Sequence, residues 1–239
     1  MATDPFNELP EKDRTPSSGA ILDKWVSSAE QLLVHKNTLT GWLLSSTILV
    51  AALQRVLAND DQPLFVIKGG MFIERALDMS GRATKDIDAL YRGAISDFDK
   101  KLDEAFEGQW GVIKLTRGPI EIIENAPRVR KPRRTKITLS INGRPWRSIQ
   151  LEIAFPEGSI AKQVESIPSP SLKFFGFDNP EGLATIALAY QVAQKLHAST
   201  DPVTEDGRPN TRVRDIADLI LIQNAFYPGD TDLSPMPFS

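Results

Sequence analysis

The spacing of apolar residues in the first ninety positions predicts helices interrupted by two short strands. Apolar positions recur at helical intervals over residues 20–59, with no strand signal among them. The apolar run Leu64–Ile67 stops at Gly69-Gly70, a pattern typical of a buried strand that ends in a tight turn. Helical spacing resumes over residues 71–79, and residues 85–91 predict the next strand.

Strands dominate the middle of the chain, and helices follow them. A short amphipathic helix is expected over residues 98–106, and longer helices over 181–198 and 212–225. Asn142-Gly143 is a strong hairpin signal. Strand patterns cover residues 112–115, 120–123, 136–141 and 149–155. This order predicts an α+β fold, a mixed sheet with flanking helices and a helical C-terminal unit.

Proline-rich stretches suggest the domain boundaries. Residues 1–18 hold three prolines and no apolar run, which predicts a flexible arm rather than a signal peptide. Residues 156–180 hold four prolines and predict irregular structure. The expected division is an arm (1–18), an α/β domain with N-terminal helices (19–160), a linker (161–180), a helical domain (181–227) and a flexible tail (228–239).

One uncharged stretch, residues 37–54, raises the question of a membrane span. Its hydroxyl and amide side chains are too many for the ~20 predominantly apolar residues that a span requires, so it predicts a buried helix. With no span and no export signal, we expect a protein of the cytoplasm that has no contact with a membrane.

Composition narrows the possible chemistry. The 239 residues include no cysteine and two histidines, which excludes disulfides, thiolate metal sites, cysteine nucleophiles and multi-histidine metal sites. Lys and Arg number 28 against 31 Asp and Glu, a net charge of -3, so any basic surface must be local. The chemistry that remains relies on carboxylates, lysines and arginines.

Two aspartates in one predicted strand are the first candidate site. Asp86 and Asp88 are two residues apart, so on a strand they point the same way, with Cα atoms ~6.5–7 Å apart. Such a pair suits divalent ions in phosphoryl transfer, although it could equally be an exposed acidic pair at a strand end. Glu152 alternates with apolar neighbours, and on an adjacent strand it would be a third carboxylate, acting as metal ligand and base. It could otherwise be a solvated position.

The glycine pair and the C-terminal helices supply further candidates. Gly69-Gly70 between a strand and a helix would leave backbone N–H groups free for a triphosphate, or would simply form a tight turn. Lys195 stands in a helix rich in Ala and Leu, where a buried lysine needs an anion. Asp215 opens the last helix, where a charged residue is commonly part of a salt bridge.

Together these segments resemble the AbiEii/AbiGii-type nucleotidyltransferase toxins, which include the mycobacterial MenT proteins, of the DNA polymerase β-like superfamily. The matching segments occur in the family's order over residues 64–222: Val66–Gly70, Arg82–Asp88, Leu151–Ile153, Gln191–Ala198 and Arg212–Leu219. The Lys-Leu-His-Ala helix followed by Arg-Asp-x-x-Asp-Leu is the narrowest of these signals.

The resemblance implies a role for each matching position. It makes Asp86 and Asp88 ligands of Mg²⁺, which Mn²⁺ could replace, with Glu152 as the third carboxylate where the superfamily usually has aspartate. It assigns nucleotide binding to Lys68, Gly69, Gly70, Arg82, Lys85 and Lys195, and makes Asp215 a helical carboxylate required for activity. The implied reaction transfers a nucleoside monophosphate from an NTP to a tRNA 3′ end and so blocks translation, with a cognate antitoxin encoded nearby.

A basic segment gives an independent indication of the acceptor. Residues 117–147 contain nine basic and two acidic residues, a local net charge of +7. Such a stretch suits a phosphate backbone, although basic residues also protect strand edges. The residues expected to bind RNA are Arg128, Arg130, Lys131, Arg133 and Arg134. Two alternatives remain: a non-catalytic RNA- or protein-binding module on a degenerate nucleotidyltransferase fold, and an enzyme that nucleotidylates proteins.

Overall fold

The computed structural model describes residues 4, 6–33, 39–69, 86–124, 130–156, 163–200 and 213–226, which divide into two compact units. The first unit, residues 1–187, contains helices α1 (Gly19–Leu32), α2 (Thr40–Leu53) and α4 (Phe98–Ala105), with 3₁₀ turns at Ile95–Asp97 and Lys173–Phe175. The second unit, residues 188–239, contains α5 (Leu188–Thr200) and α6 (Val213–Phe226).

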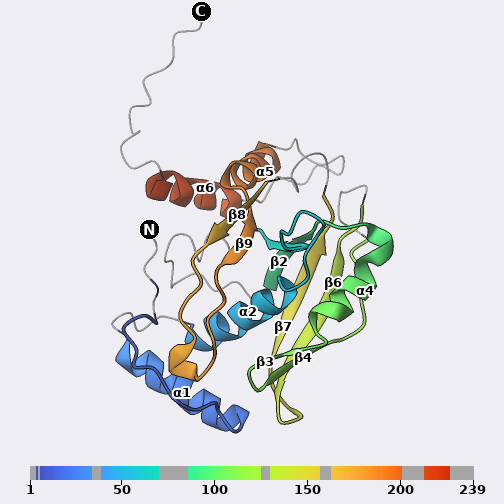
Figure 1. The fold of residues 1–239 in the computed structure, drawn as a ribbon. Coiled ribbons are helices and arrows are strands. Elements are labelled where there is room, and N and C mark those ends of the chain that lie inside the picture. Colours follow the sequence, from blue (N-terminus) through green and yellow to red (C-terminus); the bar gives the residue numbers. More distant parts are fainter. Residues whose placement is uncertain are drawn as a thin grey trace, which may run out of the picture. The chain divides into compact units, whose positions relative to one another are not determined.

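Nine strands of the first unit form one mixed sheet (Figure 1). Its order is β3-β4-β6-β7-β2-β1-β9-β8, with β5 paired to β6. β2 and β7 are parallel, as are β1 and β9, and the other neighbours are antiparallel. The bounds are β1 (Phe65–Ile67), β2 (Asp86–Tyr91), β3 (Gln109–Trp110), β4 (Ile113–Arg117), β5 (Glu121–Ile122), β6 (Arg133–Ile141), β7 (Arg144–Ala154), β8 (Val164–Ile167) and β9 (Leu183–Ile186). The predicted α+β class is confirmed.

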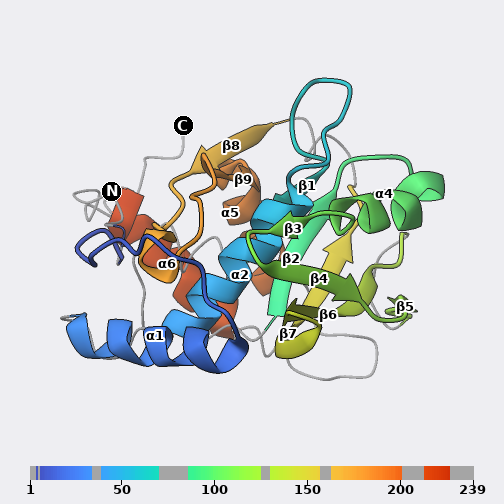
Figure 2. The ribbon, with the colours of Figure 1, turned by 60° about the horizontal axis from the view of Figure 1, so that its bottom comes forward.

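One face of this sheet is buried under helices, and the alternation of the strands fixes which side chains lie there. Ile87, Leu151 and Ile137, from β2, β7 and β6, are fully buried and belong to one core with residues of α2 and α4. Figures 1 and 2 show α2 and α4 on this face of the sheet. The residues between these positions therefore face the opposite side, where polar side chains such as Asp88 and Lys136 lie.

The uncharged stretch forms the buried helix α2, as predicted. Every residue from Leu43 to Leu53 is buried, including three hydroxyl side chains. Ser45 donates to the Gly41 carbonyl at 2.8 Å and Thr47 to the Leu43 carbonyl at 2.6 Å, so these polar groups are satisfied within the helix. Within the described residues, no helix has both the length and the hydropathy needed to cross a bilayer.

Two segments expected to be a flexible arm and a linker contribute to the core instead, although most of residues 168–182 is irregular, as predicted. Phe6 and Leu9, from the predicted flexible arm, are buried, and the Phe6 ring meets Phe175 edge to face at 5.1 Å between centroids. Phe175 and Phe177, from the predicted 161–180 linker, are buried as well. These predictions are wrong because they relied on proline content, whereas the aromatic side chains between the prolines supply apolar area that the core buries.

The helix predicted over residues 181–198 is also corrected. Leu183–Ile186 forms β9, parallel to β1, and the helix begins only at Leu188. All four residues of β9 are buried, so this short apolar run fits a sheet interior as well as a helix. The second unit accordingly starts at Leu188 rather than at residue 181. The helices predicted over 98–106 and 212–225 are confirmed.

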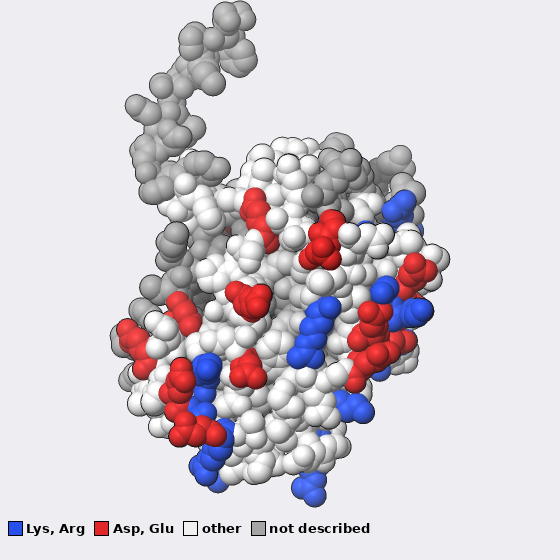
Figure 3. All heavy atoms as spheres, in the orientation of Figure 1, with Lys and Arg blue, Asp and Glu red and all other residues white. Residues whose placement is uncertain are grey.

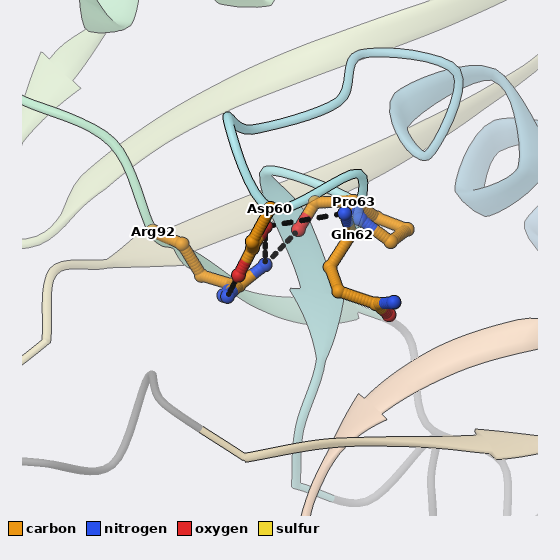
Figure 4. A network of polar contacts seen from close by, with 4 residues as sticks. All are labelled: Asp60, Gln62, Pro63 and Arg92. Carbon is orange, nitrogen blue, oxygen red and sulfur yellow. Dashed lines mark hydrogen bonds and ion pairs between the residues drawn. The ribbon is translucent and has the colours of Figure 1, made fainter.

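An ion pair fixes the start of β1 to the end of β2, at the opposite end from the glycine turn. The Arg92 guanidinium, with 7% of its side chain exposed, pairs with Asp60 at 2.5 Å and donates to the Pro63 carbonyl at 3.0 Å (Figure 4). Its backbone N–H donates to the Leu64 carbonyl. The antiparallel β1–β2 register is thereby held at the end remote from Asp86 and Asp88.

Candidate functional site

Asp86 and Asp88 lie on the face of β2 opposite the core residue Ile87, as the alternation predicts; this face, which we call the open face, is exposed at Asp86 and becomes buried at Leu90. Asp86 is exposed and Asp88 half-buried, whereas Ile87 between them is fully buried. On a strand this places the two carboxylates on one side, with Cα atoms ~6.5–7 Å apart. Both can therefore reach a divalent ion from the same side of the sheet.

A glycine turn lies directly beside Asp88. Lys68 follows β1, and its backbone N–H donates to the Asp88 carbonyl at 3.0 Å. Gly69 has φ +71°, and a Cβ built there would lie 2.8 Å from Asp88 Oδ2. Such an approach requires glycine. The predicted neighbourhood of glycine turn and carboxylate is thus present, while Gly70, Arg82 and Lys85 lie outside the described residues.

Glu152 lies on β7 next to Asp88, and Arg134 lies next to Glu152 on β6. The sheet register pairs Asp88 with Glu152 and Glu152 with Arg134, so all three share the open face. Arg134 Nη2 and Nε both donate to Glu152 Oε1, at 2.5 and 2.9 Å. These hydrogen bonds, with the Glu152 charge and weaker contributions from Asp86 and Glu121, raise the pKa of the Arg134 guanidinium above its usual value.

Asp86 and Asp88 present two carboxylates that suit a divalent ion, whereas the third carboxylate, Glu152, is paired with Arg134. Asp86 and Asp88 present oxygen donors of the kind Mg²⁺ prefers. Glu152 is bound by Arg134, and no group of three His, Asp or Glu side chains in the described ranges is arranged to hold a metal. Glu152 as metal ligand and base stays a prediction.

The basic residues of the predicted RNA site do not form one stripe. Arg133 and Arg134 are adjacent on β6 and so point to opposite faces, and the Arg133 guanidinium lies 5.7 Å from the Phe155 ring centroid. Arg130 is exposed and Lys131 half-buried, and Arg128 lies outside the described residues.

Two other basic residues of the 117–147 stretch are paired with acids. Arg117 binds both carboxylate oxygens of Asp103, at 2.6 and 2.9 Å, and Arg147 lies 3.4 Å from Asp23. The helix-covered side of the molecule shows acidic and basic side chains interspersed (Figure 3). Arg117 and Arg147 are therefore already paired with carboxylates.

Lys195 in the second unit connects α5 to α6. Its Nζ lies 3.0 Å from Asp215 Oδ1 and 2.6 Å from Asp218 Oδ2. Lys195 and Asp218 are 11% and 1% exposed, so this is a buried cluster of one cation and two carboxylates. Asp215 takes part in a salt bridge, the alternative that the sequence offered for it, while its requirement for activity and the role of Lys195 at a triphosphate stay predictions.

Asp218 is a residue that sequence reasoning missed. It follows Asp215 by three positions, which places both on one side of α6, and the spacing was visible in the Arg-Asp-x-x-Asp-Leu motif. Its burial could not be read from that motif.

Comparison with known proteins identifies the sequence family. A sequence model of the family described as "Nucleotidyl transferase AbiEii toxin, Type IV TA system" matches residues 51–235. No curated protein matches the chain.

Three solved structures are similar to parts of this chain. JHP933 of Helicobacter pylori is 17% identical, with TM-score 0.41, over 77% of this chain and 64% of that one, so this chain spans less than two thirds of its length. The nucleotidyltransferase toxin MenT4 of Mycobacterium tuberculosis is 15% identical, with TM-score 0.46, over 87% and 71%. ANT(2″)-Ia, in complex with adenylyl-2″-tobramycin, is 15% identical, with TM-score 0.36, over 78% and 90%.

Proposed function

Because the chain belongs to the AbiEii family of nucleotidyltransferase toxins from type IV toxin–antitoxin systems, we propose that it transfers a nucleoside monophosphate from an NTP to the 3′ end of a tRNA. The transfer would take place in the cytoplasm, block translation, and be counteracted by the cognate antitoxin. The observation that carries this proposal is the contact between the Gly69 turn and the Asp88 carboxylate, with Asp86 on the same face.

The chain's own groups have distinct tasks in this reaction. Backbone N–H groups of the turn after β1 bind the polyphosphate, where the absence of a Cβ lets it approach. A tRNA hydroxyl attacks the α-phosphate, a P–O bond forms, the bond to the β-phosphate breaks, and pyrophosphate leaves with its charge. Asp86 and Asp88 would hold Mg²⁺, or Mn²⁺ in its place, and such an ion neutralises charge on the phosphates when bound.

The remaining predicted residues complete the proposal. Lys68, Gly70, Arg82, Lys85 and Lys195 would add contacts to the nucleotide, and Asp215 would hold Lys195 through the 3.0 Å ion pair. The hydroxyl proton passes to a carboxylate, for which Glu152 is the candidate, because both hydrogen bonds from Arg134 go to its Oε1 and Oε2 can accept the proton.

A labelling experiment tests the proposal. Purified protein is incubated with each α-labelled NTP, Mg²⁺, total tRNA and total protein, and the label is followed into each fraction. We expect label in tRNA, its loss on addition of EDTA, and its return with excess Mg²⁺. Asp86→Ala and Lys195→Ala should lower the rate at least about 100-fold, the scale of losing one electrostatic stabiliser. For Lys195→Ala, amide hydrogen exchange in α5 and α6 separates a lost nucleotide contact from a lost ion pair with Asp215 and Asp218. Asp178→Ala, at an exposed position, serves as the control.

The fraction that carries the label distinguishes transfer to tRNA, transfer to protein and a non-catalytic binding module. Label in the protein fraction alone would identify a protein-nucleotidylating enzyme. No label in either fraction would identify a non-catalytic binding module. An Asp86→Ala protein with full activity would refute the assignment of Asp86 to the metal.

A further inference from the structure

We infer that Arg134 and Lys136, on the open face of β6, bind the phosphodiester backbone of the acceptor RNA, and that Glu152 positions Arg134 for this contact. The inference rests on the proposed function, because it takes Asp86 and Asp88 as the reaction centre. It keeps only Arg134 of the predicted RNA site, which comprised Arg128, Arg130, Lys131, Arg133 and Arg134, and adds Lys136 and a positioning role for Glu152.

The sheet order separates the two substrates. β1 and β7 flank β2 on opposite sides, so the Gly69 turn lies on one side of Asp88 and Glu152 on the other. If the polyphosphate occupies the glycine side, the attacking hydroxyl must arrive from the opposite direction for in-line displacement. Arg134, one strand beyond Glu152, lies ~10 Å from β2 in that direction.

Arg134 is held in a way that leaves its guanidinium able to bind an anion. Two of its five N–H groups donate to Glu152 Oε1, and in the described part of the chain its other N–H groups have no hydrogen-bond partner. The Arg134 side chain is 42% exposed, against 27% for Glu152. The remaining N–H donors of the planar Arg134 guanidinium suit a phosphate oxygen, and the hydrogen bonds to Glu152 fix the orientation of the guanidinium.

Lys136 provides a second cation on the same face. It follows Arg134 by two residues on β6, so the two Cα atoms are ~7 Å apart and both side chains point to the open face. Lys136 is exposed and forms no ion pair with any described residue, and its partner on β7 is the uncharged Gln150. Glu121, opposite Arg134 on β5, is the acidic residue that borders this pair of cations.

The distance from the reaction centre favours a polyanion as the ligand. Arg134 and Lys136 lie about 10 Å from the aspartates, two sheet positions away. They can bind successive phosphates of an RNA chain whose terminal hydroxyl reacts at Asp88. A small hydroxyl compound without phosphates would gain nothing from them. The surface therefore selects an acceptor with a phosphate backbone.

Binding and kinetics of the full chain test this inference. The dissociation constant for 5′-labelled total tRNA, whose 3′ hydroxyl is free, is measured by anisotropy without NTP across a salt series, together with KM for unlabelled tRNA and for the NTP. Arg134→Ala and Lys136→Ala should each weaken tRNA binding and lower the salt slope by about 0.7 per lost phosphate contact, the value for single strands. KM for the NTP should stay unchanged. Lys100→Ala, an exposed lysine on α4, should bind tRNA as the wild type does.

Glu152 variants test the positioning role. Glu152→Ala should raise KM for tRNA. In Glu152→Gln, whose side-chain carbonyl still accepts from Arg134, KM for tRNA should lie close to the wild-type value. Wild-type tRNA affinity and salt slope in Arg134→Ala and Lys136→Ala would overturn the surface. A raised Mg²⁺ requirement in Glu152→Gln with unchanged KM for tRNA would overturn the positioning role.

The two proposals fail in different ways. The wild type could fail to label RNA while Arg134→Ala and Lys136→Ala still lose tRNA affinity. That result would support the binding surface and refute the proposed transfer. Transfer to RNA with unaltered binding in both variants would refute the surface and leave the transfer intact.

Discussion

Gly69 combines a left-handed backbone with a close approach to the Asp88 side chain, and both favour glycine at this position. Its φ of +71° costs an L-residue roughly 1–2 kcal/mol, and a Cβ would lie 2.8 Å from Asp88 Oδ2. We expect Gly69→Ala to lower the free energy of unfolding by at least about 1–2 kcal/mol and to reduce nucleotide transfer, because the methyl group displaces the Asp88 carboxylate. Urea unfolding and the labelling assay measure the two effects.

Gly143 offers a matched control for that substitution. It has a similar φ of +74°, but a Cβ there meets nothing within 4 Å. Gly143→Ala should therefore cost the backbone strain alone and leave transfer unchanged. If both variants transferred nucleotides equally well, the contact between Gly69 and Asp88 would have no catalytic importance.

The ion pair between Arg117 and Asp103 makes stability depend on pH. Hydrogen bonds from Arg117 lower the pKa of the Asp103 carboxyl below its usual value. A carboxylate with a lowered pKa in the folded state stabilises above the unfolded pKa of ~3.9, and this stabilisation is lost as pH falls through the folded pKa. Asp103 is 55% exposed, so screening limits the effect to less than about 1 kcal/mol.

The expected result is a pH-dependent difference between wild type and Asp103→Asn. The wild type should be the more stable at pH 7, and the difference should shrink below about pH 4. Urea unfolding at several pH values measures it, with Glu107→Gln, an exposed substitution, as control. A difference that stays constant down to pH 3 would contradict the role of the Asp103 charge.

At the scale of elements, strands and helices with a clear local period were predictable. Period-two alternation placed Ile87 inward and Asp86 and Asp88 outward, and Asn142-Gly143 marked the β6–β7 turn, where both residues have positive φ. The pairing of Glu152 with Arg134 was not predictable, because it depends on how strands β6 and β7 are registered. β9 was missed because four residues, three of them apolar, carry too short a pattern to separate strand from helix.

The contact between β9 and β1 supports the glycine turn. Thr185 is fully buried, and its hydroxyl donates to the Ile67 carbonyl at 2.9 Å, two residues before Gly69. Thr185→Val keeps the shape and leaves this carbonyl without the hydroxyl donor. We expect a loss of about 1–2 kcal/mol in the free energy of unfolding, with Thr185→Ser close to wild type, both measured by urea unfolding. Equal stability of the valine variant and the wild type would contradict this.

The α5–α6 pair depends on the buried cluster around Lys195. Lys195→Met removes the cation from two carboxylates, one of them 1% exposed, so we expect the second unit to lose about 3–5 kcal/mol. Amide hydrogen exchange in α5 and α6 reports this locally. Adding Asp218→Leu to Lys195→Met should recover most of the loss, because the carboxylate that then remains without the lysine, Asp215, is 21% exposed and can be solvated. Unchanged exchange in Lys195→Met alone would show that the cluster contributes nothing to helix packing.

At the scale of the whole chain, the core of the first unit draws on segments far apart in sequence. The family match begins at residue 51, yet Leu22, Trp25 and Leu44 are buried in the same core as β2 and β7. Phe6 joins them from the N-terminal segment, and Phe175 from the stretch between β8 and β9. The sheet that carries the candidate site is therefore stabilised by residues outside the family's matched region.

Phe6→Ala tests whether the N-terminal segment is part of the folded unit. The ring is 1% exposed and packs edge to face on Phe175, so its removal leaves a cavity and should cost about 3–5 kcal/mol. A flexible arm, as the proline content predicts, would give no change. Urea unfolding measures the difference, and Asn7→Ala, at the exposed neighbouring position, should stay within about 0.5 kcal/mol of wild type. Because Phe175 follows β8 and precedes β9, a large loss in Phe6→Ala alone would show that the chain's beginning stabilises the sheet edge next to β1 and the glycine turn.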